Sequence, residues 1–249
     1  MNKTQFELRN NNGCIRGTIK QSLNESVGVV ICLHGGPNGN LSGNEGIFDQ
    51  IAEKIVPLNF IVVQFSFFGS IPSDGEQKDT TLYTQKIDFE SVLDFATTNY
   101  KLPIHVIAES AGVTIAALNW MTKPRSYVLL WPAFDLKDTD LRGYFTKEWY
   151  EHVKMNGVIN DNGLIIGGDY YIDILLTDFE PSFKLPENDI LILHGQSDEE
   201  VPYSQSIKAL SLARGYVKFV TLRSAGHGFK LPKHREIILK ELFYWFSQY

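Results

Sequence analysis

Short apolar runs rich in β-branched and aromatic residues recur along this chain, separated by longer segments with helical spacing. The runs are largely apolar and bounded by glycine, proline or serine, which is typical of strands buried on both faces of a mostly parallel sheet. They lie at residues 27–33, 60–65, 104–108, 127–131, 189–193 and 217–222. Before them, TQFELRN and CIRGTIKQS flank an Asn-Asn-Gly turn, which predicts a β-hairpin.

Amphipathic segments fill the intervals between these predicted strands. Residues 84–97 place Ile87, Val92, Phe95 and Ala96 along one face at roughly helical spacing. Further helices are predicted at 46–56, 111–122, 204–213 and 234–246. Strands and helices in alternation predict an α/β fold with helices on both faces of a mostly parallel central sheet. With 249 residues the chain is long enough for a substantial core, so 1–249 is expected to be a single domain.

One stretch of roughly fifty residues, between the fourth and fifth of these runs, breaks the alternation. A structureless loop of that length is uncommon in a compact domain, so residues 134–185 are expected to form a cap insertion with secondary structure of its own. Its aromatic residues could line a pocket for an apolar or aromatic group, or they could form the core of the insertion. Trp131, Tyr170 and Tyr171 are the candidates for substrate contact. The aromatic residues of the insertion are Phe134, Tyr144, Phe145, Trp149, Tyr150, Tyr170, Tyr171, Phe179 and Phe183.

Composition and charge narrow the classes of partner. The formal net charge is −6 and the lysines and arginines are scattered, which argues against nucleic acid or an anionic membrane surface as the main partner. The polar N-terminus lacks the apolar core of a secretion signal, and no apolar run has the length of a membrane span.

Cys32 is expected to be a buried free thiol. A disulfide with Cys14 is the alternative, but a reducing, cytoplasmic location fits better. No particular oligomeric state is predicted.

The sharpest local feature is the apolar run 104–108 followed by Glu109 and Ser110. A strand that runs into a serine and directly into a helix, with small neighbours, matches the nucleophile elbow G-x-S-x-G, here with Ala108 in place of the first glycine. Such a turn exposes the serine hydroxyl at the carboxyl edge of the sheet. The N–H of Ala111 would then point at a developing oxyanion. Taken alone, Ser110 could equally be a helix N-cap.

A second glycine-rich turn follows the run 27–33, where the sequence reads His34-Gly35-Gly36-Pro37. Glycines allow the backbone to approach a substrate closely and to donate an N–H. We predict the Gly36 N–H as the second oxyanion donor, because Pro37 has no N–H to offer. An ordinary tight turn is the alternative interpretation.

Two further features complete a candidate constellation. Asp198 follows the run 189–193, with Glu199 and Glu200 as competing acids, and His227 follows the run 217–222 between two glycines. Ser110, Asp198 and His227 occur in the Ser–acid–His order of the α/β-hydrolases. Because each comes after a predicted strand, all three are expected at the same edge of the sheet.

On these motifs the chain resembles the α/β-hydrolase superfamily, and within it the small bacterial feruloyl or cinnamoyl esterases and the serine aminopeptidase-like hydrolases. HGQSDEEVP resembles the family's His-Gly-x-x-Asp-x-x-Val-Pro block, which implies Asp198 as the acid, and SAGHGF resembles the block that holds the catalytic histidine. GGDYYIDILLTDF is similar to the end of the cap in those esterases, and AESAG resembles a carboxylesterase elbow. The loop SFFGSIPS after residue 65 lacks most of the polar residues that these esterases carry there. The substrates of those esterases are therefore a weaker guide to the substrate of this chain.

The resemblance implies a serine hydrolase that cleaves a carboxylic ester through an acyl-enzyme, with no metal and no cofactor required. The expected partner is a small-molecule ester, with an aromatic or apolar acyl group as one option. A thioesterase or a peptidase or amidase of the same fold is the nearest alternative. A catalytically silent binding protein with this fold is the alternative from another class.

Overall fold

The apolar runs form the strands of one eight-stranded sheet in the computed structural model, which describes residues 1–36, 39–118, 120–121, 123–161 and 163–249. The strands are β1 (Asn2–Arg9), β2 (Cys14–Gln21), β3 (Gly28–Leu33), β4 (Phe60–Phe65), β5 (Ile104–Glu109), β6 (Ser126–Leu130), β9 (Asp189–Gly195) and β10 (Val217–Leu222). Their order across the sheet is β1-β2-β4-β3-β5-β6-β9-β10. The β1–β2 hairpin lies at one edge, its two strands pair antiparallel, and β2 pairs antiparallel with β4; the pairs from β4 to β10 are all parallel. The predicted α/β fold with a mostly parallel sheet is confirmed.

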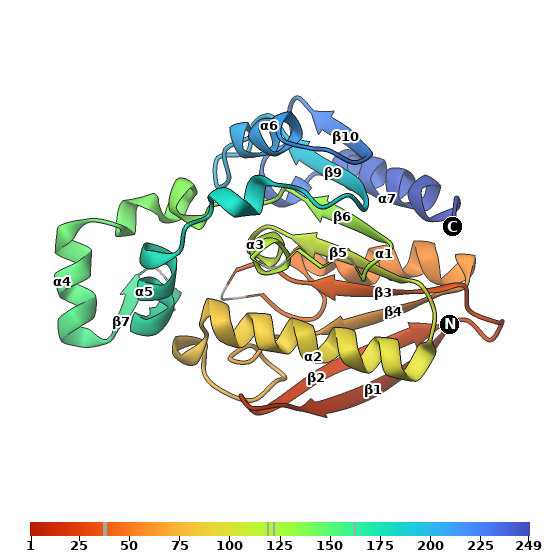
Figure 1. Ribbon diagram of the computed structural model, residues 1–249, viewed down its shortest axis with the longest axis horizontal. Helices are drawn as coiled ribbons and strands as arrows, with labels where there is room; N and C mark the ends of the chain where they lie inside the picture. The colour runs from red at the N-terminus through yellow and green to blue at the C-terminus, as the bar shows by residue number, and fades with distance from the viewer. Residues whose placement is uncertain (37–38, 119, 122, 162) are drawn as a thin grey trace.

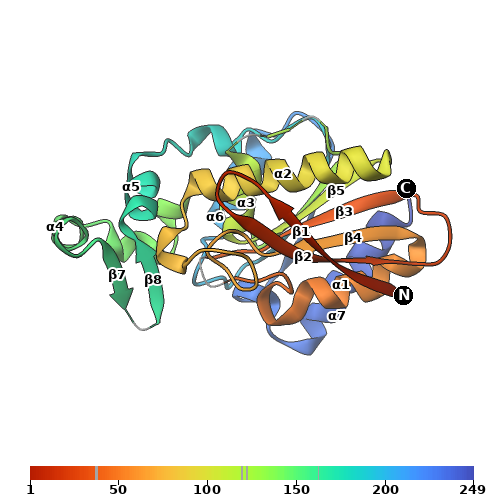
Figure 2. The ribbon, with the colours of Figure 1, turned by 90° about the horizontal axis from the view of Figure 1, so that it is seen from below.

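Helices cover both faces of the sheet (Figures 1 and 2). On one face lie α1 (Ile47–Ile55) and α7 (Pro232–Phe246), and on the other lie α2 (Leu82–Tyr100), α3 (Ala111–Ala117) and α6 (Ser204–Ser211). Because side chains alternate along a strand, each buried strand contributes to both interfaces. In β5, Val106 and Ala108 pack toward α2 and α3, whereas Ile107 packs toward α1 and α7.

Two helices differ from their predicted lengths by more than two residues. The helix α2 starts earlier than predicted because the Thr81 side chain caps its first turn by accepting a hydrogen bond from the Thr84 N–H. The helix α3 was predicted to reach residue 122 but ends at Ala117. Asn119 and Thr122, in the remainder of that predicted helix, lie outside the described residues. Beyond it, Trp120 donates its indole N–H to the carbonyl of Ser182.

Residues 134–185, which we call the 134–185 segment, connect β6 to its neighbour β9. Figure 1 shows this segment projecting to one side of the sheet. It contains the short helices η4 (Leu136–Asp138), η5 (Asp140–Tyr144) and η6 (Glu180–Phe183), the helices α4 (Lys147–Asn156) and α5 (Gly168–Leu176), and the hairpin strands β7 (Val158–Asp161) and β8 (Leu164–Gly167). It is tied to the rest of the fold at the start of α2, where the Leu82 N–H donates to the Asp173 carboxylate.

Most aromatic side chains of the 134–185 segment pack against one another. The ring of Phe145 stacks on that of Tyr171, and Tyr144 meets Trp149 edge to face. Phe134 and Phe183 pack together nearer the sheet. These contacts favour the interpretation in which the aromatic residues mainly form the segment's own core.

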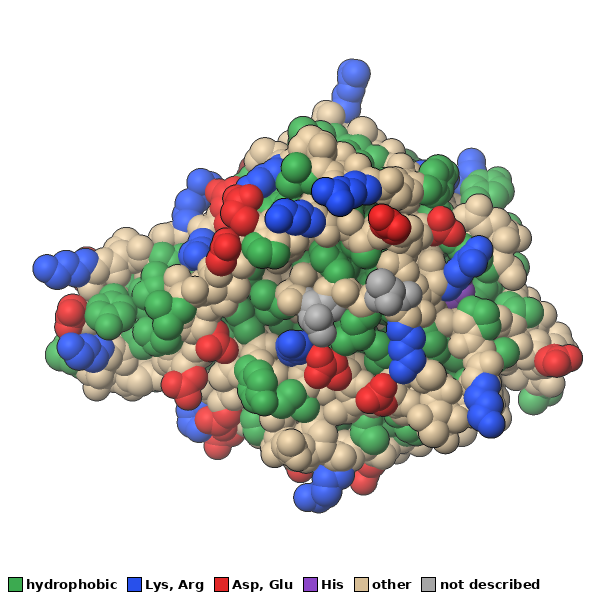
Figure 3. Space-filling view, in the orientation of Figure 1, with side chains coloured by type: hydrophobic (Ala, Val, Ile, Leu, Met, Phe, Trp, Pro, Cys, Tyr) green, Lys and Arg blue, Asp and Glu red, His purple; other side chains and the backbone are tan. Residues whose placement is uncertain are grey.

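The remaining composition-based expectations concern cysteines, charge and membrane spans. Cys14 and Cys32 are both buried with free thiols, so the alternative of a disulfide between them is wrong. On the face shown in Figure 3, lysine and arginine side chains lie scattered among acidic ones. Across the part of the chain that the structure describes, helices fall short of the length and apolar character needed to cross a bilayer.

Close packing between α3 and the end of β3 leads to a stability prediction. A Cβ on Gly112 would lie 2.5 Å from the Leu33 carbonyl oxygen and 2.7 Å from that of His34. We expect Gly112→Ala to destabilise the protein by about 1–3 kcal/mol, because backbone must move to make room. The matched control is Gly143→Ala, where the added Cβ meets nothing within 4 Å. Urea unfolding of both variants checks this, and equal midpoints would contradict it.

Candidate active site

Ser110 lies at a strained turn between β5 and α3. Its φ of 49° and ψ of −125° lie outside the regions that L-residues usually adopt. The turn is held by three backbone hydrogen bonds: the Ser110 N–H donates to Leu130 O at 3.0 Å, and the Ser110 carbonyl accepts from Val113 N at 3.0 Å and from Ala133 N at 3.2 Å. A Cβ on Gly35 would lie only 2.7 Å from the Ser110 Cβ, so this approach needs glycine. The elbow predicted from sequence therefore has the expected local geometry.

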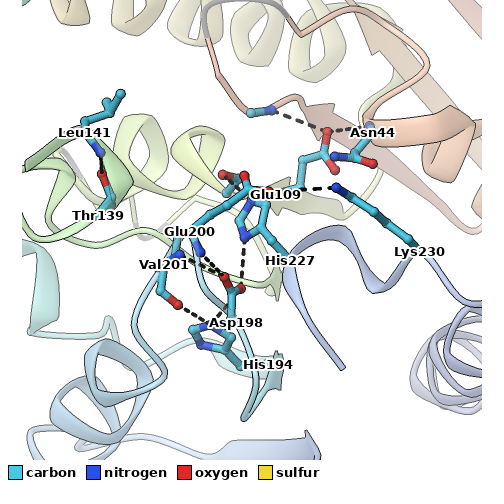
Figure 4. Close-up of polar contacts among 12 residues, drawn as sticks. Asn44, Glu109, Thr139, Leu141, His194, Asp198, Glu200, Val201, His227 and Lys230 are labelled. Carbon is cyan, nitrogen blue, oxygen red and sulfur yellow. Dashed lines mark hydrogen bonds and ion pairs between the residues drawn. The ribbon is translucent and has the colours of Figure 1, made fainter. Parts of the chain in front are cut away.

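The three residues singled out in the sequence form one hydrogen-bonded chain. The Ser110 hydroxyl lies 3.0 Å from His227 Nε2, and His227 Nδ1 lies 2.9 Å from Asp198 Oδ2. With the proton on Nδ1, His227 donates to the carboxylate and accepts from the serine. His227 begins the short helix η7 (His227–Phe229) after β10, and Asp198 lies in the loop after β9 (Figure 4). The chain has the geometry in which a histidine can take the serine proton.

Asp198 accepts hydrogen bonds from four donors. His227 Nδ1 and His194 Nε2 both approach Oδ2, the latter at 3.2 Å, while the N–H groups of Glu200 and Val201 donate to Oδ1 at 3.0 and 2.8 Å. Burial alone would raise the pKa of Asp198, but the bonds from His194 and His227 hold that pKa well below its ordinary value. The carboxylate therefore stays ionised beside His227.

His194 is fully buried in the strand that precedes the Asp198 loop. Its Nε2 also lies 3.2 Å from the Val201 carbonyl, so two acceptors face this nitrogen and the proton belongs there. Its Nδ1 then accepts from the Ser206 hydroxyl at 2.7 Å. His194 thus holds Asp198 from the side opposite His227.

Several carboxylates face His227 besides Asp198. Burial alone would lower the pKa of the imidazole, but the hydrogen bond and charge of Asp198, followed by the charges of Glu200 and Glu109, raise that pKa above its ordinary value. Glu200 Oε2 lies 3.7 Å from Nε2, while Glu200 Oε1 lies 3.9 Å from the Lys230 ammonium. Glu200 is therefore next to the nitrogen that faces Ser110, and Asp198 alone occupies the orienting position on Nδ1. Glu199 is exposed.

The two predicted oxyanion donors lie next to Ser110 at the same cavity. Gly36 has a left-handed φ of 56°, and Ala111 begins α3. Gly35, which precedes Gly36, is held in place by His34. The His34 Nδ1–H donates to the Gly35 carbonyl at 3.1 Å, and the Nε2 accepts from the Phe67 N–H at 3.1 Å. Burial lowers the pKa of His34 to about 4, so the ring stays neutral. Pro37, which was judged unable to donate, lies outside the described residues.

A cavity of about 480 Å³ opens over Ser110. The 134–185 segment supplies an apolar side, and the loops after β3, β9 and β10 supply a side with several charged groups. The apolar side includes Leu136, Leu141, Leu164 and Tyr170. The titratable groups are Glu45, Glu200, His227 and Lys230 from the loops, Glu109 from the end of β5, and Asp140 from the 134–185 segment itself. Burial, followed by the charge of Glu200, raises the pKa of Asp140.

The three candidate substrate residues have different positions. Trp131 and Tyr170 line the cavity, although each is almost completely buried. The Trp131 ring meets His227 edge to face at 6.2 Å between centroids. Tyr171 is not among the described residues that line the cavity; its hydroxyl donates to the Tyr144 carbonyl at 3.1 Å. Because successive residues of a helix face different directions, only the first tyrosine of this pair in α5 reaches the cavity.

Sequence reasoning missed Glu109, Asn44 and Arg235, which form polar contacts around the elbow. The sequence offered a signal for Glu109 alone, which stands between an apolar strand and a serine. Its burial could be predicted from that position, but its hydrogen-bond partners could not. Within the described ranges, no group of three or more His, Cys, Asp or Glu residues is arranged to hold a metal ion.

The profile of the prolyl oligopeptidase family matches residues 110–249, a range that contains Ser110, Asp198 and His227. The chain belongs to the prolyl oligopeptidase family. It is therefore an enzyme of the hydrolase class by descent, with the α/β-hydrolase fold that the sequence resemblance implied. Comparison with curated proteins gives no match.

Solved structures agree on the fold of this family member. It is similar to Est1E from Butyrivibrio proteoclasticus with bound ferulic acid, at a TM-score of 0.83 and 19% identity over 98% of each chain. It is also similar to an esterase from Pyrococcus furiosus, with a TM-score of 0.72 and 17% identity, over 100% of this chain and 91% of that one. A third similar structure is mouse alpha/beta hydrolase domain-containing protein 10, with a TM-score of 0.76 and 16% identity, over 98% of this chain and 99% of that one.

The carboxylates around His227 lead to a prediction for the pH profile. A general base must be neutral, so a raised pKa places the acid limb of kcat/KM above the ordinary histidine value of about 6.5. Glu200→Gln removes a charge beside Nε2 and lowers the His227 pKa, so the acid limb should move to lower pH. Exposed Glu199→Gln is the control and should leave the limb in place. An unmoved limb in Glu200→Gln would show that this contact does not tune the base.

Proposed function

We propose that this member of the prolyl oligopeptidase family is a serine hydrolase that cleaves a carboxylic ester through an acyl-enzyme. The observation that carries the proposal is the hydrogen-bonded chain from the Ser110 hydroxyl through His227 to Asp198. A serine–imidazole–carboxylate chain whose serine faces a cavity is the arrangement that activates a serine for acyl transfer.

The proposed reaction has two steps. His227 Nε2 takes the Ser110 proton as the hydroxyl oxygen attacks the ester carbonyl, and the carbonyl electrons move onto its oxygen. The N–H groups of Gly36 and Ala111 donate to this oxyanion, an interaction for which the loss of one donor typically costs about 10²–10³ in rate. Collapse breaks the ester bond, and the imidazolium returns its proton to the leaving alcohol. Water then attacks the acyl-serine with the same base, which releases the acid.

The substrate proposal rests on the cavity. We infer that the 134–185 segment acts as a cap, and that its apolar residues Leu136, Leu141 and Tyr170 contact the acyl group. A cavity of about 480 Å³ suits a small ester rather than a polymer. The ferulic acid bound in the Est1E structure supports an aromatic acyl group as a first choice. Neither a metal nor a cofactor enters the proposed steps.

A short peptide or amide is the second candidate, and family membership is the observation that favours it. The same residues would perform the same two steps, with an amine in place of the alcohol as the leaving group. A thioester is a weaker candidate. Four carboxyl groups border the cavity, and their negative charge would repel the phosphate groups of a carrier such as coenzyme A. Cytoplasmic location stays a prediction.

The nucleophile assignment is tested directly. Ser110→Ala should lower hydrolysis of p-nitrophenyl acetate by about 10⁴-fold or more and abolish labelling by a fluorophosphonate probe, because the attacking oxygen is gone. The remote, exposed Ser211→Ala is the control and should keep both properties. A wild-type protein that neither labels nor turns over any ester would instead support a silent binding protein.

The substrate class is tested with a matched panel. We expect kcat/KM for methyl ferulate to exceed that for feruloyl p-nitroanilide by at least about 10²-fold, because resonance makes an amide carbonyl a weaker electrophile than an ester carbonyl and no amine-binding contact is built into the proposal. The panel consists of methyl ferulate, the feruloyl thioester of coenzyme A, feruloyl p-nitroanilide and an alanine dipeptide p-nitroanilide. Faster cleavage of the dipeptide substrate than of every ester would replace the ester proposal with a peptidase.

A further inference from the structure

Glu109 is a buried carboxyl for which the proposed chemistry has no use. It is the residue before Ser110, and its side chain is 2% exposed. Its Oε1 accepts a hydrogen bond from the Asn44 N–H at 2.8 Å and a longer one from the Gly35 N–H at 3.4 Å (Figure 4). Gly35 precedes the proposed oxyanion donor Gly36. One carboxylate oxygen therefore connects the elbow to both ends of the segment between β3 and α1.

Arg235 makes the corresponding contacts from α7. Its side chain is 7% exposed, its Nε–H donates to the Phe229 carbonyl at 3.1 Å, and its Nη2–H donates to the Asn44 carbonyl at 3.1 Å. Phe229 ends the short helix that begins with His227, and its φ of 47° is left-handed. The guanidinium thus holds the histidine loop, residues 226–229, against the loop around Asn44.

Asn44 is the meeting point of these two buried charged groups. Its backbone N–H is bound by Glu109 and its backbone carbonyl by Arg235. The backbone around it is left-handed at Gly43, Glu45 and Gly46, with φ of 71°, 48° and 73°, and the strain lies at Glu45, the one non-glycine residue of the three. Such conformations cost about 1–3 kcal/mol at a non-glycine residue and persist only where surrounding contacts impose them.

We propose that Glu109 and Arg235 are a pair of positioning residues, which hydrogen-bond to the backbone of Asn44 from two sides. Through these contacts they fix the oxyanion loop, residues 34–36, and the histidine loop relative to Ser110. This inference rests on the proposed function, since it concerns the geometry of that reaction. Neither residue transfers a proton or forms a bond in it. A misplacement of about 1 Å in such groups can cost 10²-fold in rate, so a rigid connection between the two loops matters.

The chemistry of Glu109 indicates which substitution is informative. Burial raises the pKa of its carboxyl to about 7, against the opposing effect of the N–H groups of Asn44 and Gly35. Near neutral pH both protonation states are present, and Oε1 can accept in either. Glutamine keeps an oxygen acceptor at this position, whereas leucine keeps the approximate volume and removes it.

The experiment compares Glu109→Leu, Glu109→Gln, Arg235→Met, Arg235→Lys and the double variant Glu109→Leu/Arg235→Met. We expect Glu109→Leu and Arg235→Met each to lower kcat by about 10–100-fold with KM changed less than about threefold, because the groups act on the transition state rather than on substrate binding. Glu109→Gln should recover most of kcat. The double variant should lose much less than the product of the two single losses, because both act through Asn44.

A second readout separates positioning from a general loss of stability. Inhibition constants for an alkyl trifluoromethyl ketone, which forms an oxyanion with Ser110, should weaken in parallel with kcat/KM across the series. Circular dichroism checks that each variant is folded. Exposed Glu236→Gln and Lys233→Met on the same helix remove one charge each and should change neither rate nor inhibition.

The outcomes are decisive in either direction. A raised KM with an unchanged kcat would make Glu109 a substrate contact and overturn the proposal, as would single losses that multiply in the double variant. If Glu109→Leu does not fold, Arg235→Lys carries the test: lysine reaches one carbonyl instead of two, and an unchanged kcat in that folded variant overturns the proposal. An active Ser110→Ala would overturn the proposed function, whereas fully active Glu109 and Arg235 variants beside an inactive Ser110→Ala overturn this inference alone.

Discussion

The strained backbone at Ser110 is the constraint on which the rest of the site depends. A φ of 49° at a non-glycine residue is maintained because its N–H is bound to Leu130 and its carbonyl to Val113 and Ala133. The strand before it and the helix after it are both fully packed, so the turn cannot relax without disturbing the core. This turn directs the hydroxyl out of the sheet edge toward His227. It also brings Gly35 so close to the elbow that only glycine fits there.

The electrostatics of the site centre on one carboxylate held by two histidines. Asp198 receives N–H bonds from His194, from His227 and from the backbone of its own loop, and these bonds compensate for its removal from water. The result is an anion whose charge is fixed beside the imidazole. Glu200 adds a second negative charge on the opposite nitrogen. A positive charge on His227 is thus stabilised from both sides by carboxylates that the fold already holds in place.

Local patterns in the sequence predicted the fold and the convergence of Ser110, His227 and an acid after the run 189–193. The choice of Asp198 among the three acids there came from the resemblance of HGQSDEEVP to the family block. Strands of a parallel sheet end at one edge, so residues that directly follow strands must converge whatever the intervening loops do. The direction of individual loop and helix side chains is not encoded this way. Tyr171 was therefore predicted at the cavity but points into the 134–185 segment. The contacts of Glu109 and Arg235 with Asn44 depend on a left-handed loop conformation that no spacing rule describes.

The path of the chain through the sheet has a consequence for how this enzyme can diversify. The 134–185 segment leaves the sheet after β6 and re-enters at β9, and these two strands are direct neighbours in parallel register. Strand pairing there is complete without any contribution from the segment. Changes of length or sequence between those two points therefore leave the pairing of β6 with β9 intact, although the segment does contact the loop after β9, where the Asp140 N–H donates to the Glu200 carbonyl at 2.8 Å. A protein engineer can therefore vary the residues that border the cavity from this segment while the strands that position Ser110 stay paired.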